Sequence, residues 1–531
     1  GSRPEAVDRE RPLAELGFDS LIGVEVRNIV RAELNRDLPV SEMSQNPNLN
    51  ELAEILLRQV NDESKAWTKD DDEADDAFAS YVDDHTGLQG GELVAGSHPF
   101  ILGMGTANPP NATDQMHSAE TLISLLGVDG KVAERLRRIY ANSGIKTRHG
   151  VFSTAEQVWT GTRRANLEPG EKALMEERNY LYMEEAQKVA YQSCTRAIEH
   201  WGGDRSRITH VLSVSCTGTC VPGIEFRMAQ QLGLSPTTER LSINFMGCFG
   251  GLSGLKTAKA LAEEDPSRRI LVVCTELCSL HFSPDLRTDN IVGGAIFADG
   301  SAAAIVGGNP TDDEVPMFEL ARTASVFIPD SADKMAWDLG DYGWKLGLSP
   351  DIPELLCSNI RPFCRHLIGD RGISFEECHW PLHPGGKAIV EAIERTCKLE
   401  RSQTQATWDV LADNGNMSSC TILFVLKRLA EQLQEHGPSH KWAVTLAFGP
   451  GLSMEGILCR PVVGLSRDEI YAAASSINAP ADNTGIEDFV DKEDEEAIAQ
   501  ARFNIAQEAH KRLGAANVTD EDFDENHVAA L

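Results

Sequence analysis

The stretch Leu241-Ser242-Ile243-Asn244-Phe245-Met246-Gly247-Cys248-Phe249-Gly250-Gly251 decides how this chain is interpreted. Its first residues alternate between apolar and polar, which predicts a strand, and a helix-like sequence follows Gly251. The turn between the two elements carries Cys248. The positive end of a helix dipole favours the thiolate form of a cysteine, and a thiolate attacks thioester carbonyls. The stretch therefore predicts a strand, turn and helix that present a nucleophile.

An ordinary buried thiol is the alternative interpretation of Cys248, because free cysteines are often small core residues and the chain has 12 of them. Two further motifs favour the nucleophile. They are His383-Pro384-Gly385-Gly386, after an apolar strand end, and Gly415-Asn416-Met417-Ser418-Ser419, before an apolar run. Cys248, His383 and Asn416 together supply a nucleophile, an imidazole and a neutral amide donor. Decarboxylative condensation needs these groups, since its enolate oxygen must be held by hydrogen-bond donors.

Residues 97–462 resemble the type III polyketide synthases, the chalcone and stilbene synthase group, from end to end. The resemblance implies an α/β fold of the thiolase type, a duplicated five-layered αβαβα arrangement, and a homodimer that uses malonyl-CoA. Its motifs are Ile101-Leu102-Gly103-Met104-Gly105-Thr106-Ala107-Asn108-Pro109-Pro110, Cys216-Thr217-Gly218-Thr219 with Pro222-Gly223, the Cys248 turn, Phe297-Ala298-Asp299-Gly300, the His383 and Asn416 motifs, and Phe448-Gly449-Pro450-Gly451.

The same resemblance assigns a cavity and a tunnel. Phe297 corresponds to a gatekeeping phenylalanine and Leu346 to a second gatekeeper that is usually aromatic, while Thr217 and Ser418 are implied cavity residues. Departures from the plant pattern imply a reshaped cavity and a product different from those of plants: Cys278 and His281 replace threonines, and Trp337 replaces a glycine. At the tunnel the implied coenzyme A or pantetheine contacts are Arg135, Arg138 and Ala388, and Asn142 replaces a third basic residue.

A carrier motif precedes this region. In Glu15-Leu16-Gly17-Phe18-Asp19-Ser20-Leu21 a serine stands at a helix start, with Asp19 placed to cap the helix. An ordinary cap is the alternative for so short a string. Residues 10–60 as a whole resemble the acyl carrier domain of fungal-type iterative polyketide synthases. The resemblance implies a small helical bundle, a 4'-phosphopantetheine arm on Ser20, a phosphopantetheinyl transferase that attaches it, and upstream polyketide or fatty acid synthase modules.

The expected organisation has four parts. Residues 8–62 form the carrier domain, 63–96 an acidic flexible linker, 97–462 the condensing domain, with halves of about 97–310 and 311–462, and 463–531 an acidic tail without an assigned role. Helices are predicted at 21–34, 49–60 and 493–513. Strands at 211–215, 270–275 and 421–426 alternate with helical patterns, which favours a layered α/β domain. A flexible linker of about 35 residues has a reach of roughly 30–35 Å, which favours delivery of the starter from the carrier.

Composition narrows the function further. The net charge is -32, which disfavours nucleic acid and anionic membranes as partners. The cysteines show no metal-binding spacing and fit a reducing, cytoplasmic compartment, and no metal or nicotinamide motif is found. No apolar run is long enough to span a membrane. The start, Gly1-Ser2-Arg3-Pro4, lacks the features of a signal peptide.

Three other interpretations remain open at this stage. The first is a related thiolase-fold enzyme that condenses once, such as a ketoacyl-carrier synthase III-like enzyme or a hydroxymethylglutaryl-CoA synthase. The second is a papain-like hydrolase, which also uses Cys, His and Asn in that order, although the local signature Cys-Gly-Ser-Cys-Trp is absent. The third is an inactive docking module whose acidic tail binds a partner. Product mass distinguishes the first, and carbon dioxide release from labelled malonyl-CoA distinguishes the last.

Overall fold

The computed structural model describes residues 98–465, apart from 165–167, 169–170, 283–285, 370–371 and 438–439. The chain divides into two units, 1–92 and 93–531, and every described residue belongs to the second. The predicted carrier domain with Ser20, the linker, the tail from residue 466 onward and the helices expected at 21–34, 49–60 and 493–513 lie outside the described residues.

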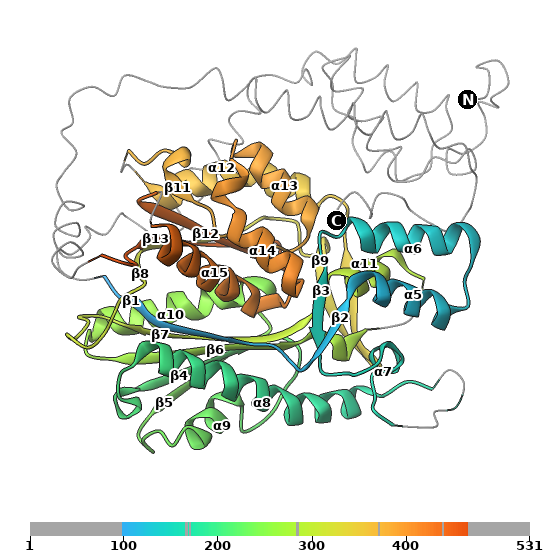
Figure 1. The fold of residues 1–531 in the computed structure, drawn as a ribbon, viewed down its shortest axis with the longest axis horizontal. Helices are drawn as coiled ribbons and strands as arrows, with labels where there is room; N and C mark the ends of the chain where they lie inside the picture. Colours follow the sequence, from blue (N-terminus) through green and yellow to red (C-terminus); the bar gives the residue numbers. More distant parts are fainter. Residues whose placement is uncertain are drawn as a thin grey trace, which may run out of the picture. The chain divides into compact units, whose positions relative to one another are not determined.

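A nine-stranded sheet is the frame of the described part of the chain (Figure 1), and its strand order is β11-β12-β13-β8-β1-β7-β6-β4-β5. Strands β1 and β8 pair through Phe100 with Glu319 and Ile101 with Phe318, so the sheet is narrowly joined there and falls into two parts. The strands are β1 (Phe100–Ala107), β4 (His210–Ser215), β5 (Glu239–Asn244), β6 (Arg269–Leu277), β7 (Asp299–Gly307), β8 (Phe318–Phe327), β11 (Cys378–His379), β12 (Trp442–Gly449) and β13 (Ser453–Pro461).

Helices form three layers around the two parts of the sheet (Figure 1). Helices α8 (Met175–Trp201) and α9 (Ile224–Gln231) cover the β4–β7 part, and α12 (Ile352–Ile368) and α13 (Lys387–Thr396) cover the β8–β13 part. Helices α10 (Gly250–Glu264) and α15 (Thr421–His436) lie between them, and α14 (Gln405–Asn414) precedes α15. The predicted αβαβα arrangement is therefore confirmed.

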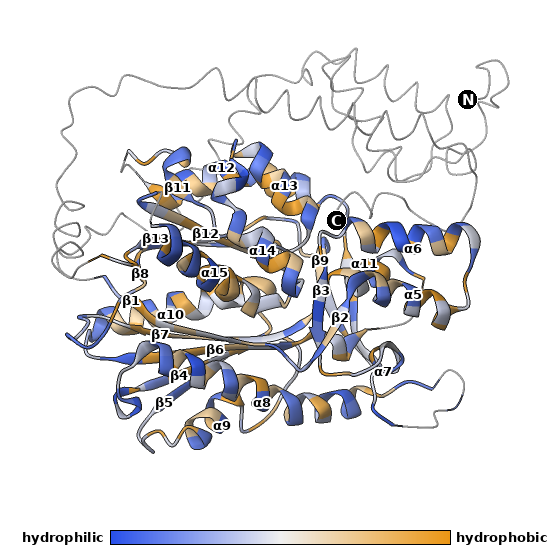
Figure 2. Cartoon of the chain, viewed as in Figure 1, coloured by the Kyte–Doolittle hydropathy of each residue, from blue (hydrophilic) through white to orange (hydrophobic). Residues whose placement is uncertain are grey.

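Burial explains the layering. Figure 2 shows apolar and polar residues sharing the surface of α8, and the helix buries Leu181, Ala186 and Val189 among its apolar residues. Helix α10, in the middle layer, buries Leu252, Leu255 and neighbouring small residues on two sides. A helix between two sheets needs such a sequence, because both of its faces leave water. None of the helices described in residues 98–465 is long and apolar enough to cross a membrane.

One predicted strand is wrong. The strands expected at 211–215 and 270–275 are present as β4 and β6, whereas 421–426 forms the first turns of α15. All six residues of this run are buried, and buried Leu429, Ala430 and Leu433 continue it at helical spacing. A short apolar run has no period that separates a buried strand from a buried helix. The residues after 426, with their helical spacing, therefore show which of the two elements forms.

A flanking group of elements packs beside the sheet around one hydrophobic cluster, which includes Leu136, Tyr140, Trp159, Phe297 and Leu346. The group contains β2 (Asn111–Asp114), β3 (Thr147–Gly150), β9 (Met335–Gly340), β10 (Gly343–Leu348), α5 (Gln115–Leu126), α6 (Gly130–Asn142), α7 (Ala155–Thr160) and α11 (Thr288–Ile296). Short 3-10 turns are η5 (Arg205–Arg207), η6 (Gly247–Phe249), η7 (Cys278–His281), η8 (Phe375–Glu377), η9 (Arg401–Gln403) and η10 (Ser418–Cys420).

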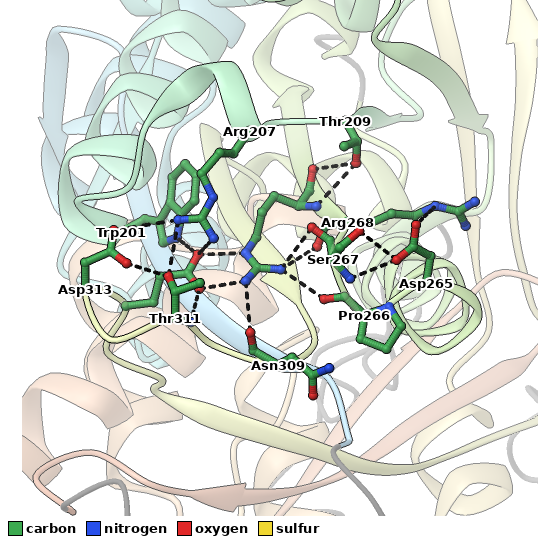
Figure 3. Close-up of polar contacts among 12 residues, drawn as sticks. Trp201, Arg207, Thr209, Asp265, Pro266, Ser267, Arg268, Asn309, Thr311 and Asp313 are labelled. Carbon is green, nitrogen blue, oxygen red and sulfur yellow. Dashed lines mark hydrogen bonds and ion pairs between the residues drawn. The ribbon is translucent and has the colours of Figure 1, made fainter.

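A buried ion-pair cluster fixes the segment that leads from β7 to β8, and Figure 3 shows its surroundings. Arg269 donates to both carboxylate oxygens of Glu314 over 2.7 and 2.6 Å. Trp201 Nε1 donates to the same carboxylate over 2.8 Å, and Arg207 lies 3.2 Å from it. The cluster therefore ties this connecting segment to β6 and α8.

Candidate active site

The turn after β5 presents Cys248 as the sequence predicted. Phe245 has a left-handed backbone, with φ of 62°, and Gly247 follows with φ of 77°. A Cβ at Gly247 would lie 2.4 Å from Pro450 Cδ, so only glycine fits this position. Cys248 lies in η6, directly before α10. The strain at Phe245 and the close approach at Gly247 are the features expected where a chain is bent for function.

The start of α10 packs directly on the segment that follows Asn416. A Cβ at Gly251 would lie 2.2 Å from the carbonyl oxygen of Ser419, so the second glycine after Cys248 permits this contact. Gly415 ends α14 with φ of 71°, and Ser418 has φ of 51°. These turns reverse the chain between α14 and η10 and bring Asn416 to the nucleophile turn.

The Asn416 side chain is held in one orientation. Its Oδ1 accepts a hydrogen bond from the Ser418 backbone N–H over 2.8 Å. Its Nδ2 donates one hydrogen bond to the Gly385 carbonyl over 3.1 Å. An amide nitrogen carries two hydrogens, so the second N–H of Asn416 serves Cys248, whose pKa it lowers, or a ligand oxygen bound beside that thiol. Asn416 lines the same cavity as Cys248.

His383 lies in the loop between β11 and α13. Its backbone N–H donates to the Leu446 carbonyl over 2.8 Å, which fixes the loop on β12. The side chain is 1% exposed, and neither ring nitrogen has a hydrogen-bond partner. Buried polar atoms are normally paired, so an imidazole with two unpaired nitrogens at a cavity wall is a group prepared for a ligand or a proton.

These side chains meet in one cavity of about 340 Å³. It brings together the predicted residues Cys248, His383, Asn416, Ser418, Phe297 and Trp337. Most of the wall is apolar, which keeps water away from a reactive carbonyl and strengthens the few polar contacts. The remaining lining residues are Cys216, Phe245, Gly247, Val292, Ile296, Met335, Trp344, Leu348, Ser349, Ile352, Gly385, Gly386, Ile389, Phe448 and Pro450.

The electrostatics differ from the sequence-based expectation for Cys248. Burial raises the pKa of this thiol to about 11, although hydrogen bonds with Ser418 and Asn416 lower it. A helix end contributes only about 0.3–1 kcal/mol in favour of a negative charge, so the dipole alone does not ionise the buried thiol. Burial also lowers the pKa of the His383 imidazole to about 3. Each shift reflects the cost of placing a single charge in this cavity, so burial favours the uncharged form of each group taken alone.

A buried carboxyl lies behind the nucleophile. Glu276, on β6, accepts hydrogen bonds from Thr217 Oγ1 over 2.7 Å and from the Cys216 backbone over 3.1 Å. Burial raises its pKa. The Cys216 sulfur lies 3.3 Å from Ser418 Oγ. Sequence reasoning missed Glu276 and Cys216, although the quoted motif Cys216-Thr217-Gly218-Thr219 contained one of them.

Four predicted cavity residues are buried but are not among the residues that line the cavity. Thr217 bonds Glu276, and its carbonyl lies 2.6 Å from His281 Nε2. Cys278 belongs to the hydrophobic cluster beside α11, as does Leu346. Leu346 pairs across the hairpin with Trp337, whereas Trp344, two residues earlier on β10, lines the cavity. Alternation along a strand could have suggested Trp344, because residues i and i+2 share a face.

The predicted tunnel residues lie on two helices. Arg135 is half-buried and Arg138 exposed on α6. Ala388 is the second residue of α13 and is followed by Ile389, which lines the cavity. No three His, Cys, Asp or Glu side chains come together as metal ligands within the described ranges.

Comparison with known families covers most of the chain. Residues 92–310 match the N-terminal domain of the chalcone and stilbene synthases, and 319–463 match the C-terminal domain. Residues 1–56 match the family described as phosphopantetheine attachment site. Cys248 lies in the first chalcone synthase match, and His383 and Asn416 lie in the second.

Individual relatives agree with these matches. The chain is 37% identical over 373 residues to "Probable polyketide synthase 1" of Dictyostelium discoideum, which covers 69% of this chain but only 12% of that protein. It is 32% identical to "Type III polyketide synthase C" of Arabidopsis thaliana, over 68% of this chain and 94% of the relative.

Among solved structures, the fold matches the C-terminal type III polyketide synthase domain of 'Steely1', described as a type I/III hybrid from Dictyostelium. The TM-score is 0.63 with 36% identity, covering 69% of this chain and 100% of that one. The fold, the two family matches and the 94% coverage of the Arabidopsis relative agree. The chain therefore belongs to the chalcone and stilbene synthase family, the type III polyketide synthases, which are acyltransferases that catalyse decarboxylative condensation.

Proposed function

We propose that this chain receives an acyl group from phosphopantetheine on Ser20, transfers it to Cys248, extends it with malonyl-CoA and cyclises the product. Expected products are of the pyrone, resorcinol or phloroglucinol type. The observation that carries the proposal is the single apolar cavity lined by Cys248, His383 and Asn416. Phosphopantetheine itself is indicated by the match of residues 1–56, and Ser20 is the serine of the carrier motif within that match.

Acyl transfer begins with a proton. His383 has both ring nitrogens unpaired, so it accepts the proton of the Cys248 thiol as the thioester enters. The resulting thiolate and imidazolium attract each other strongly in an apolar cavity, which offsets the cost of charging either group alone. The thiolate attacks the acyl carbonyl carbon, and the pantetheine sulfur leaves with the proton from His383. Cys248 then carries the acyl group as a thioester.

Condensation uses the same donors. The malonyl thioester loses carbon dioxide, and the negative charge moves onto its carbonyl oxygen. Neutral His383 offers one N–H, and Asn416 offers the Nδ2 hydrogen that is not bonded to Gly385. These donors stabilise the enolate oxygen. The enolate carbon attacks the acyl carbon on Cys248, and the cysteine leaves as thiolate, ready to accept the extended chain.

Delivery from a carrier fits the arrangement of family matches. The chain spans 12% of the length of the first Dictyostelium relative, and we infer that synthase modules act before it. A tethered carrier gives an effective concentration in the mM range. A phosphopantetheinyl transferase is then a required partner. Arg135 and Arg138, at the proposed tunnel, can bind the phosphates of coenzyme A. Malonyl-CoA can therefore still act as the extender unit.

A homodimer accompanies this proposal. Strand β5 is an edge of the described sheet, and its residues are mostly exposed. Exposed apolar residues gather on and beside it: Leu241, Phe245 and Met246, with Val221 98% exposed. An unpaired edge with apolar side chains favours association with a second strand. We infer that a second copy of this chain covers it, and size measurement by analytical ultracentrifugation tests this.

The decisive test follows the carbon. The full chain, treated with a phosphopantetheinyl transferase and loaded with an acyl group, is given labelled malonyl-CoA. We expect carbon dioxide release and products longer than the starter by two-carbon units, and loss of the extended products in Cys248→Ala. Mass spectrometry also locates the arm. An unmodified Ser20, or the same products from Cys248→Ala, would contradict the proposal.

A further inference from the structure

The carbonyl groups at the end of α11 are all satisfied from outside the helix. Arg148 Nη1 donates to the Gly294 and Phe297 carbonyls over 2.7 and 2.8 Å. Gln115 Nε2 donates to the Ala295 carbonyl over 2.7 Å, and the Asn416 backbone N–H donates to the Ile296 carbonyl over 2.9 Å. A helix leaves its last carbonyls without internal partners, and here every carbonyl from 294 to 297 has found one.

Arg148 is itself held rigidly. It lies on β3, is 9% exposed, and its Nε donates to Gln115 Oε1 over 2.8 Å. Gln115 is 2% exposed and donates also to Ser143 Oγ over 3.0 Å. The guanidinium lies 5.8 Å from the centre of the Tyr140 ring. A cation at the carboxyl end of a helix is favoured by the helix dipole, so the charge suits the position it occupies.

The same guanidinium supports the loop of Asn416. A Cβ at Gly415 would lie 3.0 Å from Arg148 Cγ and 3.0 Å from the Ile296 carbonyl, so the loop rests directly on the arginine stem. Both backbone groups of Asn416 bond to the end of α11. Its N–H donates to the Ile296 carbonyl, and its carbonyl accepts from the Ala298 N–H over 2.9 Å. Phe297 and Asn416 form one isolated bridge. The arginine thus bonds one partner of that bridge, Phe297, and packs beside the residue that precedes the other.

We propose that Arg148, aided by Gln115, is a positioning residue that holds the cavity wall at Phe297 and the amide of Asn416 in one fixed geometry. Arg148 is not among the residues that line the cavity, so it acts through these two. The inference rests on the proposed roles of Phe297 and Asn416. It adds one expectation: substitution of Arg148 changes both the length of the polyketide, through Phe297, and the rate of decarboxylation, through Asn416.

Chemistry specific to arginine underlies the proposal. The planar guanidinium reaches three acceptors in different directions, whereas a lysine ammonium at the end of a flexible stem satisfies fewer of them in the same geometry. Arg148→Lys keeps the positive charge but loses the several fixed donor directions of the guanidinium. Arg148→Met removes both the charge and the donors. We therefore expect a graded effect, small in the lysine variant and large in the methionine variant.

The first measurement needs no polyketide. Hydrogen exchange is followed by mass spectrometry in segments 293–299 and 414–418 of the full chain, in wild type, Arg148→Lys, Arg148→Met and Gln115→Met. We expect exchange to rise in both segments together, by about tenfold per hydrogen bond lost. Arg269→Lys is the matched control, because Arg269 is equally buried and multiply bonded but belongs to the Glu314 cluster. It should leave both segments unchanged.

The second measurement reads function. At a temperature where all variants are folded, product lengths and the rate of carbon dioxide release from malonyl-CoA are compared. We expect Arg148→Lys to shift the product distribution and to lower the rate of carbon dioxide release several-fold. Arg269→Lys, compared where the two variants are equally folded, should change neither. Should Arg148→Met not fold, Gln115→Met decides, since it frees one carbonyl only. Unchanged exchange in both segments in Arg148→Lys and Gln115→Met overturns the proposal. If exchange rises in the variants but the wild-type chain makes no polyketide, the proposed function is refuted and the positioning role of Arg148 stands.

Discussion

The rings of Phe297 and Trp337 meet edge to face, with centroids 5.2 Å apart and planes at 80°. One ring comes from the end of α11 and the other from the β9–β10 hairpin, and both line the cavity. The contact closes the cavity between two separate elements. These two rings therefore form one boundary of the cavity that Cys248 also lines.

Trp337→Gly should enlarge this space. The removed ring leaves room beside Phe297, so we expect longer starters to be accepted and longer products to form. Mass analysis of products from a series of acyl starters measures the change. Leu339→Ala is the control, because Leu339 lies on the same strand and is 64% exposed. An unchanged product series in Trp337→Gly would show that the limit on length lies elsewhere.

Asn416→Asp should impair decarboxylation while the cavity keeps its shape. A carboxylate has no hydrogen to offer an enolate oxygen, and it adds a negative charge beside one. Loss of one such donor typically lowers the rate by about 10²–10³-fold. Carbon dioxide release from malonyl-CoA reports the effect. Alkylation of Cys248 by iodoacetamide should remain, and Asn414→Asp, which alters a neighbouring amide outside the cavity lining, should release carbon dioxide normally.

His383→Gln should slow alkylation of Cys248 at neutral pH by more than tenfold. Without the imidazole the thiol has no proton acceptor, and burial holds its pKa at about 11. The alkylation rate of the variant should therefore rise about tenfold for each pH unit up to about pH 10, because only the thiolate reacts. Wild type should react faster at pH 7. Equal rates in the two proteins at pH 7 would exclude His383 as the base.

Ser20→Ala should abolish delivery from the carrier and leave some turnover of free acyl-CoA. On the proposed assignment the arm can no longer be attached, whereas the proposed coenzyme A route past Arg135 and Arg138 does not need it. Product formation from an acyl-loaded carrier is compared with that from the same acyl-CoA. We expect the loaded carrier to be used faster by the wild-type chain. Equal rates with both donors, or no effect of the substitution, would argue against a handoff.

Glu314→Gln should destabilise the folded domain by about 3–5 kcal/mol at pH 7, because Arg269 is left as an unpaired buried charge. Burial by itself raises the pKa of Glu314, but hydrogen bonds from Arg269 and Thr311 lower it to about 2. The ordinary value is 4.5, so this stability is present above pH 4.5 and is lost as the pH falls toward 2.

Urea unfolding of Glu314→Gln and wild type between pH 7 and 3 measures this dependence, and the difference in stability between the two proteins should narrow as the pH falls. Asp313→Asn is the control. Its side chain is 63% exposed and its ion pair with Arg207 spans 3.6 Å, so solvent screens the pair and the substitution should change stability little. A constant difference between Glu314→Gln and wild type across this range would contradict the assignment.

The sequence was sufficient for the fold and for the three groups that meet in the cavity. Cys248, His383 and Asn416 each stand in a motif with glycines whose spacing follows from tight turns, so their local context is visible without coordinates. The strand expected at 421–426 failed because an unbroken apolar run carries no period. Its helical nature depends on α15 lying between two parts of the sheet.

Residues that act through others were beyond such reasoning. Arg148 is a lone cation in a short strand, and its acceptors are main-chain carbonyls, which every residue possesses. Trp344 lines the cavity where Leu346 was expected. Alternation places both residues on one face of β10, and the packing of Leu346 against Gly293 of α11, which separates them, is not visible in the sequence. The sequence showed the helix end that favours a thiolate but not the opposing burial, which raises the pKa of Cys248 to about 11.

The β9–β10 hairpin is a two-stranded sheet separate from the nine-stranded one among the described residues. It nevertheless supplies Trp337 and Trp344 to the cavity. Substitutions in this hairpin reshape the cavity wall without removing a strand pairing of the nine-stranded sheet, although Trp344 also contacts Phe245 of the nucleophile turn. Cavity shape and the sheet that holds the nucleophile can therefore vary in large part independently between related enzymes.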